Sequence, residues 1–132
     1  MSKTVLIVED EIFVAMDIER ILSDAGFTVT AIAADRETAL ATPVTPDLAF
    51  IDINLRDGRT GPLVANDLAA HGTKVFYVTA NPAQIDPIAP TAIGYIRKPF
   101  SADAIRSAAL LGANDAGGMP AHAEITLLRG GA

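Results

Sequence analysis

Apolar residues occur along this chain in short runs that alternate with segments of helical periodicity. The runs at residues 4–8 and 48–51 are uninterrupted, which is typical of strands buried on both faces. The other segments with strand-like patterns lie at 27–33, 74–80 and 92–97. Between the runs, apolar residues recur every three or four positions, which predicts helices. These helices are expected at 12–25, 35–40, 61–71 and 101–111.

The alternation of strands with helices predicts the fold class. Short strands that alternate with helices form a parallel sheet covered by helices on both faces. We therefore expect an α/β protein with a doubly wound, five-stranded parallel sheet. The segment 81–91 contains Pro82, Pro87 and Pro90. Each proline removes an amide donor and clashes with the preceding helical turn. The fourth helix of the alternation is therefore predicted to be short or missing.

The pattern weakens near the C-terminus. Residues 113–132 are rich in Gly and Ala, and we expect them to form a flexible tail after a single domain at 1–112, with 125–128 as a short apolar contact. The stretch after Leu111 is too short for a second, DNA-binding or enzymatic domain. The chain is therefore expected to act as a stand-alone domain.

Charge and composition exclude several classes of function. The net charge is −6 and no basic stripe is visible, which argues against direct nucleic acid binding. No apolar run approaches the length of about 20 residues that spans a bilayer, and the N-terminus lacks a signal peptide pattern. The absence of Cys fits a cytoplasmic protein. Of the 16 acidic residues, 11 precede position 58, which suggests a hard cation.

Polar residues follow four of the predicted strands. Glu9 and Asp10 follow the first strand, Asp52 the third, Thr79 ends the fourth and Lys98 follows the fifth. The carboxyl ends of parallel strands open onto one crevice, so these side chains are expected to meet. An ionised carboxylate needs a partner there. Mg²⁺ suits one or two carboxylates with a phosphoryl oxygen, and a carboxylate beside it can attack phosphorus. Lysine would neutralise the phosphoryl charge and threonine would hydrogen-bond one of its oxygens.

These motifs resemble a known family. The segments Val-Leu-Ile-Val-Glu-Asp-Glu, Phe-Ile-Asp-Ile-Asn-Leu, Val-Thr-Ala and Tyr-Ile-Arg-Lys-Pro-Phe occur in the order and spacing of the receiver domain of two-component response regulators. The similarity covers roughly residues 3–111 and implies a flavodoxin-like (receiver-type) sheet. It departs from the common pattern at Glu9, where many members have Asp, and at Leu55-Arg56, where Met-Pro is usual. The short spacing from Thr79 to Lys98 removes residues from the fourth-helix region.

The resemblance implies a role for each matching residue. Asp52 would be the phosphoacceptor, assisted by Thr79 and Lys98. The Mg²⁺ ligands would be Glu9, Asp10, Asp52 and the backbone carbonyl of Asn54. Thr79 and Tyr95 would act as the switch pair, and the bond before Pro99 would be cis. Asn54 and Asn81 would lie where family members tune dephosphorylation.

The implied function is a single-domain response regulator in a Mg²⁺-dependent phosphorelay. It would take a phosphoryl group from a histidine kinase or a histidine phosphotransfer protein and signal to a downstream protein by contact, without membrane binding. It would catalyse only its own phosphorylation and dephosphorylation. One alternative is a phosphorylation-independent interaction module with the same fold. A Mg²⁺-dependent phosphohydrolase is disfavoured, because Asn54 stands where such enzymes carry an acid/base Asp.

Overall fold

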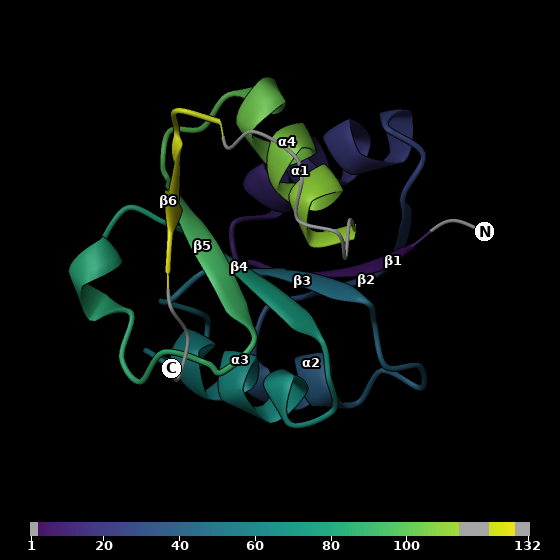
Figure 1. The fold of residues 1–132 in the computed structure, drawn as a ribbon. Coiled ribbons are helices and arrows are strands. Elements are labelled where there is room, and N and C mark those ends of the chain that lie inside the picture. The colour runs from purple at the N-terminus through teal and green to yellow at the C-terminus, as the bar shows by residue number, and fades with distance from the viewer. Residues whose placement is uncertain (1–2, 114–121, 129–132) are drawn as a thin grey trace.

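The computed structural model describes residues 3–113 and 122–128 of the chain, and the ribbon in Figure 1 follows a central sheet through them. The strand order is β2-β1-β3-β4-β5-β6, and the pairs among the first five strands are all parallel. The strands are β1 (Thr4–Val8), β2 (Thr28–Ala33), β3 (Leu48–Ile51), β4 (Lys74–Thr79), β5 (Ala92–Arg97) and β6 (Ile125–Leu127). The helices are α1 (Ile12–Asp24), α2 (Arg36–Leu40), α3 (Gly61–Ala69), the 3₁₀ helix η1 (Pro82–Gln84) and α4 (Ala102–Ala113).

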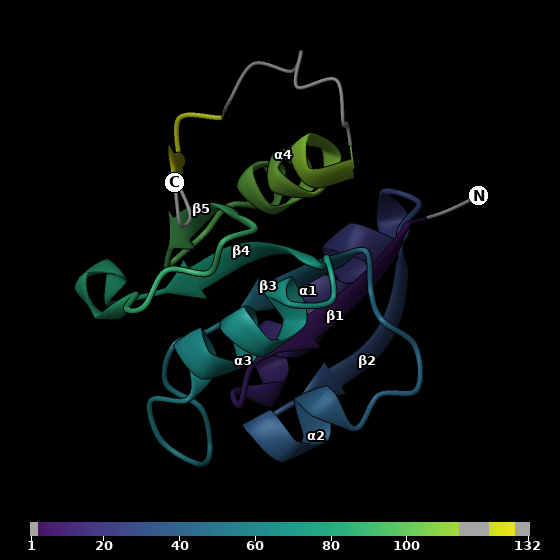
Figure 2. The same cartoon turned by 60° about the horizontal axis from the view of Figure 1, so that its bottom comes forward.

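Helices cover both faces of the sheet. Figures 1 and 2 show α1 and α4 on one face, with α2 and α3 on the other. Because parallel crossovers are right-handed, the connection from β1 to β2 and the connections that run the opposite way along the sheet, from β2 to β3 and β4, lie on opposite faces. The predicted doubly wound α/β fold is therefore confirmed.

Two apolar cores lie against the two faces. On the α1/α4 side, Phe50 and Phe76 stack with ring centroids 5.5 Å apart and an interplanar angle of 16°. On the α2/α3 side, the buried Tyr77 packs among aliphatic residues. All four residues of β3 are buried, which explains why this strand reads as an unbroken apolar run. The central strand is thereby fixed in position up to Asp52, which follows it.

The proline-rich segment between β4 and β5 contains only the one-turn helix η1, so the prediction of a short or missing fourth helix is confirmed. The segment is nevertheless tied to the domain. Ile85 is buried in the core beneath it. The amide of Ala89 donates to the Tyr77 hydroxyl at 3.1 Å, and Asn66 Nδ2 donates to the Pro87 carbonyl at 3.1 Å. Side-chain contacts thus replace the helical hydrogen bonds that proline removes.

A sixth strand differs from the prediction of five strands followed by a flexible tail. Residues Ile125–Leu127 form β6, which pairs antiparallel with β5, shown in yellow in Figure 1. The Ile125 side chain is only 7% exposed, and the Leu128 amide donates to the Ile93 carbonyl at 2.8 Å. The sequence predicted an apolar contact at 125–128 but no strand, because three residues are too few for a periodic pattern. The rest of the predicted tail, at 114–121 and 129–132, lies outside the described residues.

Gly94 permits the close approach of β6 to β5. A Cβ atom at this position would lie 2.5 Å from the carbonyl oxygen of Thr126, which is closer than van der Waals contact allows.

Within the described ranges, no helix has both the length and the apolar character needed to cross a bilayer.

The substitution Gly94→Ala is expected to displace β6 and lower the free energy of unfolding by roughly 1–3 kcal/mol, because the added methyl group overpacks a backbone contact. Amide hydrogen exchange of Leu128 reports the displacement, since its amide is bonded to β5. Thr126→Ala is the control, because it keeps the backbone carbonyl and should leave this exchange rate unchanged. Equal exchange in all three proteins would contradict the prediction.

Candidate functional site

The carboxyl ends of three parallel strands bring Glu9, Asp52 and Lys98 together. Glu9 follows β1, Asp52 follows β3 and Lys98 follows β5. The strand ladders continue into these residues: the amide of Asp52 donates to the Val8 carbonyl at 2.9 Å, and the amide of Lys98 donates to the Thr79 carbonyl at 3.0 Å. Sheet hydrogen bonds, rather than a loop, therefore fix the backbone of these residues.

A lysine ammonium group contacts two buried carboxylates at this edge. Lys98 Nζ lies 2.9 Å from Asp52 Oδ2 and 2.7 Å from Glu9 Oε1. Glu9 is 3% exposed and Asp52 is 8% exposed. The second carboxylate oxygen of Asp52, Oδ1, accepts a hydrogen bond from the Ile53 amide at 2.7 Å. Asp52 therefore presents Oδ2, rather than Oδ1, to the ammonium group.

Glu9 is held in an electrostatically costly position. Burial raises the pKa of its carboxyl group to about 7; Lys98 lowers this pKa and the Asp52 charge raises it. Glu9 Oε1 pairs with Lys98 Nζ at 2.7 Å, and no other donor among the described residues reaches this oxygen. Burial also opposes the charge of Lys98, but its contacts with Glu9 and Asp52 outweigh burial and raise the lysine pKa.

Three carboxylates at this edge form a set of ligands suited to a hard cation. Oxygen atoms of Glu9, Asp10 and Asp52 all lie within 4.8 Å of one another. Asp10 is exposed, so the cluster is open to solvent on its side. A buried carboxylate oxygen that shares its lysine with Asp52, beside two further carboxylates, fits an oxygen-coordinated divalent ion such as Mg²⁺. The residues that could hold it are thus among those that the sequence singled out.

Thr79 and Tyr95 occupy different surroundings. Thr79 is fully buried at the end of β4, and its Oγ1 accepts from the Asn81 amide at 3.0 Å. A hydroxyl that accepts this bond keeps its hydrogen as a donor. Tyr95 lies in β5 opposite Tyr77, half-buried against the core on the α2/α3 side. The bond between Lys98 and Pro99 is cis.

Two residues that sequence analysis did not single out shape the site. Gly61 lies where a Cβ atom would be 1.9 Å from the backbone oxygen of Asp52, so only glycine lets α3 begin here. Gln84, in η1, accepts a hydrogen bond through Oε1 from Asn54 Nδ2 at 2.9 Å. The Gly-Pro pair at the start of α3 is a weak sequence signal for Gly61. Gln84 and Asn54 are thirty residues apart, and no pattern in the sequence links them.

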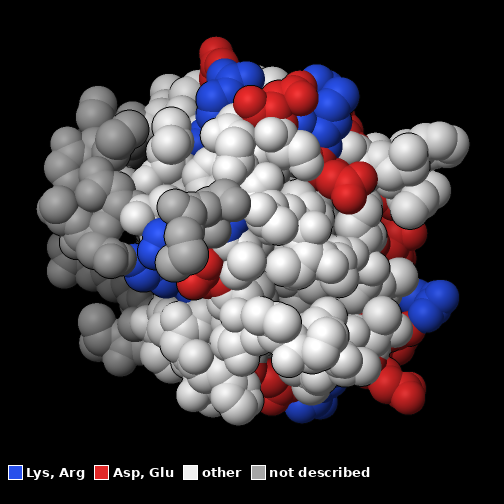
Figure 3. Space-filling model, turned by 90° about the vertical axis from the view of Figure 1, so that its right-hand side faces the viewer, with Lys and Arg blue, Asp and Glu red and all other residues white. Residues whose placement is uncertain are grey.

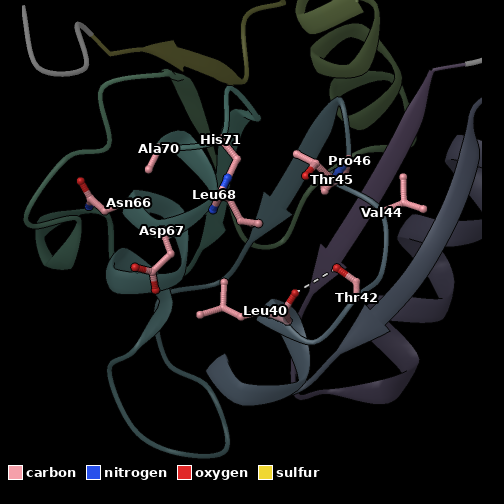
Figure 4. Close-up of a pocket in the computed structure, with 11 residues that line it drawn as sticks. Leu40, Thr42, Val44, Thr45, Pro46, Asn66, Asp67, Leu68, Ala70 and His71 are labelled. Carbon is pink, nitrogen blue, oxygen red and sulfur yellow. Dashed lines mark hydrogen bonds between the residues drawn. The ribbon is translucent and has the colours of Figure 1, made fainter.

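A groove of about 520 Å³ lies between α2, the α2–β3 connection and α3 (Figure 4). Its lining includes Leu40, Val44, Pro46, Leu68 and His71. Pro46 precedes β3, whereas Asp52 follows it, so the groove and the carboxylates lie at opposite ends of this strand. The groove is therefore separate from the candidate site.

Charged side chains on the face shown in Figure 3 stand in mixed groups of both signs around a broad uncharged area. Ion pairs of this kind join Arg20 to Asp17 at 2.7 Å and to Asp24 at 3.8 Å. This face of the described chain therefore carries no basic stripe of the kind that tracks a nucleic acid backbone.

The raised pKa of Glu9 predicts a pH-dependent effect of Glu9→Gln in protein freed of metal. Between the ordinary value of 4.5 and the folded value of about 7, folded Glu9 keeps a proton that the unfolded chain releases. The wild type therefore loses stability as pH rises through this window, and the Gln variant does not. Chemical denaturation should show the variant more stable by about 1–3 kcal/mol at about pH 8, with little difference at about pH 4.

The variant Glu11→Gln controls for the loss of one exposed negative charge. A stability difference between Glu9→Gln and wild type that stays constant across this pH range would contradict the assignment of the effect to Glu9.

Comparison with known proteins assigns the chain and its fold to a family. The model of the response regulator receiver domain matches residues 5–110. The phyllosphere-induced regulator PhyR of Methylorubrum extorquens is 33% identical over an alignment of 105 residues, which covers 76% of this chain and 39% of that protein. The chain thus spans less than half the length of this relative.

Solved structures agree with the family match. The PhyR receiver (REC) domain of Erythrobacter litoralis is 32% identical, with a TM-score of 0.72 over 83% of this chain and 91% of that one. The anti-anti-sigma factor PhyR of Bartonella quintana is 31% identical, with a TM-score of 0.69 over 85% of this chain and 46% of that one. Because the family model matches most of the chain, from β1 into α4, the chain belongs to the response regulator receiver domain family.

Proposed function

We propose that Asp52 accepts a phosphoryl group from a histidine kinase or a histidine phosphotransfer protein, with Mg²⁺ bound nearby. The chain would act as a single-domain response regulator in a cytoplasmic phosphorelay and signal by protein contact. It would catalyse only its own phosphorylation and dephosphorylation. The observation that carries this proposal is the contact of Asp52 Oδ2 with Lys98 Nζ inside a cluster of three carboxylates.

The geometry supports a separate role for each side chain of the site. Asp52 Oδ2 faces the ammonium group, whereas Oδ1 is held by the Ile53 amide, so Oδ2 is the proposed nucleophile. It forms a bond to phosphorus as the bond from phosphorus to the donor breaks. Lys98 would stabilise the added negative charge on the phosphoryl oxygens, and the Thr79 hydroxyl would donate to one of them. Bound Mg²⁺, held by Glu9, Asp10, Asp52 and the Asn54 carbonyl, would neutralise the remaining charge.

The surface beside the site suits a protein as phosphoryl donor. A groove of about 580 Å³ joins α1 to the segment after β5, and both Phe13 and Lys98 line it. Phe13 is 83% exposed, and Ile12 and Met16 on the same helix are also exposed. An exposed aromatic side chain beside an acidic site is typical of a protein contact surface. We propose that the phosphoryl donor docks over α1.

The output of the domain is proposed to be contact with another protein. Support comes from a relative, since the PhyR protein of Bartonella quintana is described as an anti-anti-sigma factor. Because this chain matches less than half of that protein, the comparison supports only the class of partner. Tyr95 and Thr79 are proposed as the switch pair, because they lie on adjacent strands that both lead to the site.

Incubation with acetyl phosphate and Mg²⁺ is expected to add one phosphoryl group to the wild type and none to Asp52→Asn, because the amide is not a nucleophile at this position. Intact-protein mass spectrometry measures the gain. Chelation of Mg²⁺ should abolish it in the wild type. Equal gain in both proteins would disprove Asp52 as the acceptor, and no gain with any donor would favour an interaction module.

Phe13→Ala is expected to slow phosphoryl transfer from a histidine kinase that phosphorylates the wild type by on the order of tenfold, because an exposed aromatic anchor is lost. The rate with acetyl phosphate should not change, since the small donor needs no docking surface. Leu63→Ala removes a comparably apolar, exposed side chain from α3 and serves as the control. A loss of rate with both donors would point to damage at the site instead.

A further inference from the structure

The hydrogen bond from Asn54 Nδ2 to Gln84 Oε1, at 2.9 Å, joins two segments that flank the candidate site. Asn54 lies two residues after Asp52, in the segment that follows β3. Gln84 lies five residues after Thr79, the last residue of β4. Because β3 and β4 are parallel neighbours, this bond spans the gap between their carboxyl ends. It therefore joins the two segments that leave the sheet edge where Asp52 and Thr79 stand.

Gln84, which supplies the acceptor oxygen, is held in place by the packing and hydrogen bonds of its turn. Gln84 is the last residue of η1, and the next residue, Ile85, is buried in the core on the α2/α3 side. The amide of Gln84 donates to the Asn81 carbonyl at 3.0 Å, and the amide of Ile85 donates to the Pro82 carbonyl at 3.1 Å. Further along, Ala89 is anchored to Tyr77. The turn is thus a fixed support rather than a freely moving loop.

The side chain of Asn54, the donor of this hydrogen bond, is less restrained. Asn54 is exposed, whereas its neighbours Ile53 and Leu55 are buried. The backbone around it is fixed, since Leu55 and Gly58 exchange backbone hydrogen bonds at 2.8 and 3.0 Å. An exposed carboxamide on a fixed backbone samples several rotamers unless a partner selects one. Gln84 is such a partner.

We propose that Gln84 is a positioning residue that holds the Asn54 carboxamide across the ends of β3 and β4, where it limits the approach of water to a phosphoryl group on Asp52. This inference rests on the proposed phosphorylation of Asp52. In hydrolysis, a water oxygen bonds to phosphorus as the bond from phosphorus to Asp52 Oδ2 breaks. The carboxylate is restored, and the water proton leaves with the phosphate. Gln84 would slow this reaction and thereby set the lifetime of the phosphorylated state.

The test measures decay of the phosphorylated protein. Wild type and variants are phosphorylated with acetyl phosphate and Mg²⁺, desalted, and followed by intact-protein mass spectrometry. Gln84→Met keeps the length of the side chain but removes the acceptor, and it is expected to speed decay about three- to tenfold, the factor that the loss of one hydrogen bond can produce. Ala83→Ser, on the exposed position beside it, is the control and should decay at the wild-type rate.

Two further variants separate positioning from a general structural effect. Gln84→Glu keeps an oxygen that can accept from Asn54 Nδ2 and should restore a decay rate within about twofold of wild type. In an Asn54→Ala background, Gln84→Met should have no further effect, because the side chain through which it acts is absent. A purely structural role of Gln84 would leave its effect unchanged in that background.

The outcomes distinguish this inference from the proposed function. If the wild type takes a phosphoryl group on Asp52 but Gln84→Met decays at the wild-type rate or more slowly, the role of Gln84 is disproved and the proposed function stands. Multiplicative effects of the two substitutions would also overturn the role. If the wild type takes no phosphoryl group on Asp52, the proposed function fails and the inference fails with it.

Discussion

The contact of one lysine ammonium group with two buried carboxylates is the interaction on which the site depends. Removing Glu9, Asp52 and Lys98 from water is unfavourable for each group alone, and only their proximity offsets the loss of hydration. The balance is incomplete, because the Glu9 pKa remains raised to about 7. Asp10 and Asp52 also lie at this edge, so the carboxylates there outnumber the single ammonium group and leave an excess of negative charge. Such an excess favours a divalent cation and opposes the approach of an anion without one.

This arrangement requires a parallel sheet. The three charged residues come from strands that are distant in sequence, and only the shared direction of these strands brings their carboxyl ends to one edge. The apolar run of β3 and the stacked pair of Phe50 and Phe76 fix the central strand in the core. Core packing thus determines the position of Asp52, although no core side chain carries any charge.

Sequence alone predicted much of this structure, for a physical reason. Buried strands and amphipathic helices leave periodic patterns, so the five parallel strands were visible, and the prolines at 82, 87 and 90 predicted the loss of a helix. The candidate ligands Glu9, Asp10 and Asp52 could be inferred because they follow strands. In contrast, β6 has too few residues for a pattern, and the bond of Gln84 to Asn54 joins segments that only the folded chain brings together. The requirement for glycine at position 61 likewise arises from a tertiary contact, with the backbone of Asp52.

The presence of β6 has a consequence for the behaviour of the domain in a crowded solution. A strand at the end of a sheet displays unpaired amides and carbonyls, which can template pairing with another chain and lead to aggregation. Without β6, the six residues of β5 would form such an edge. With it, the outermost strand at this side has only three residues, and its central Thr126 is polar. The C-terminal segment thereby shortens the surface through which one copy of the domain could stick to another.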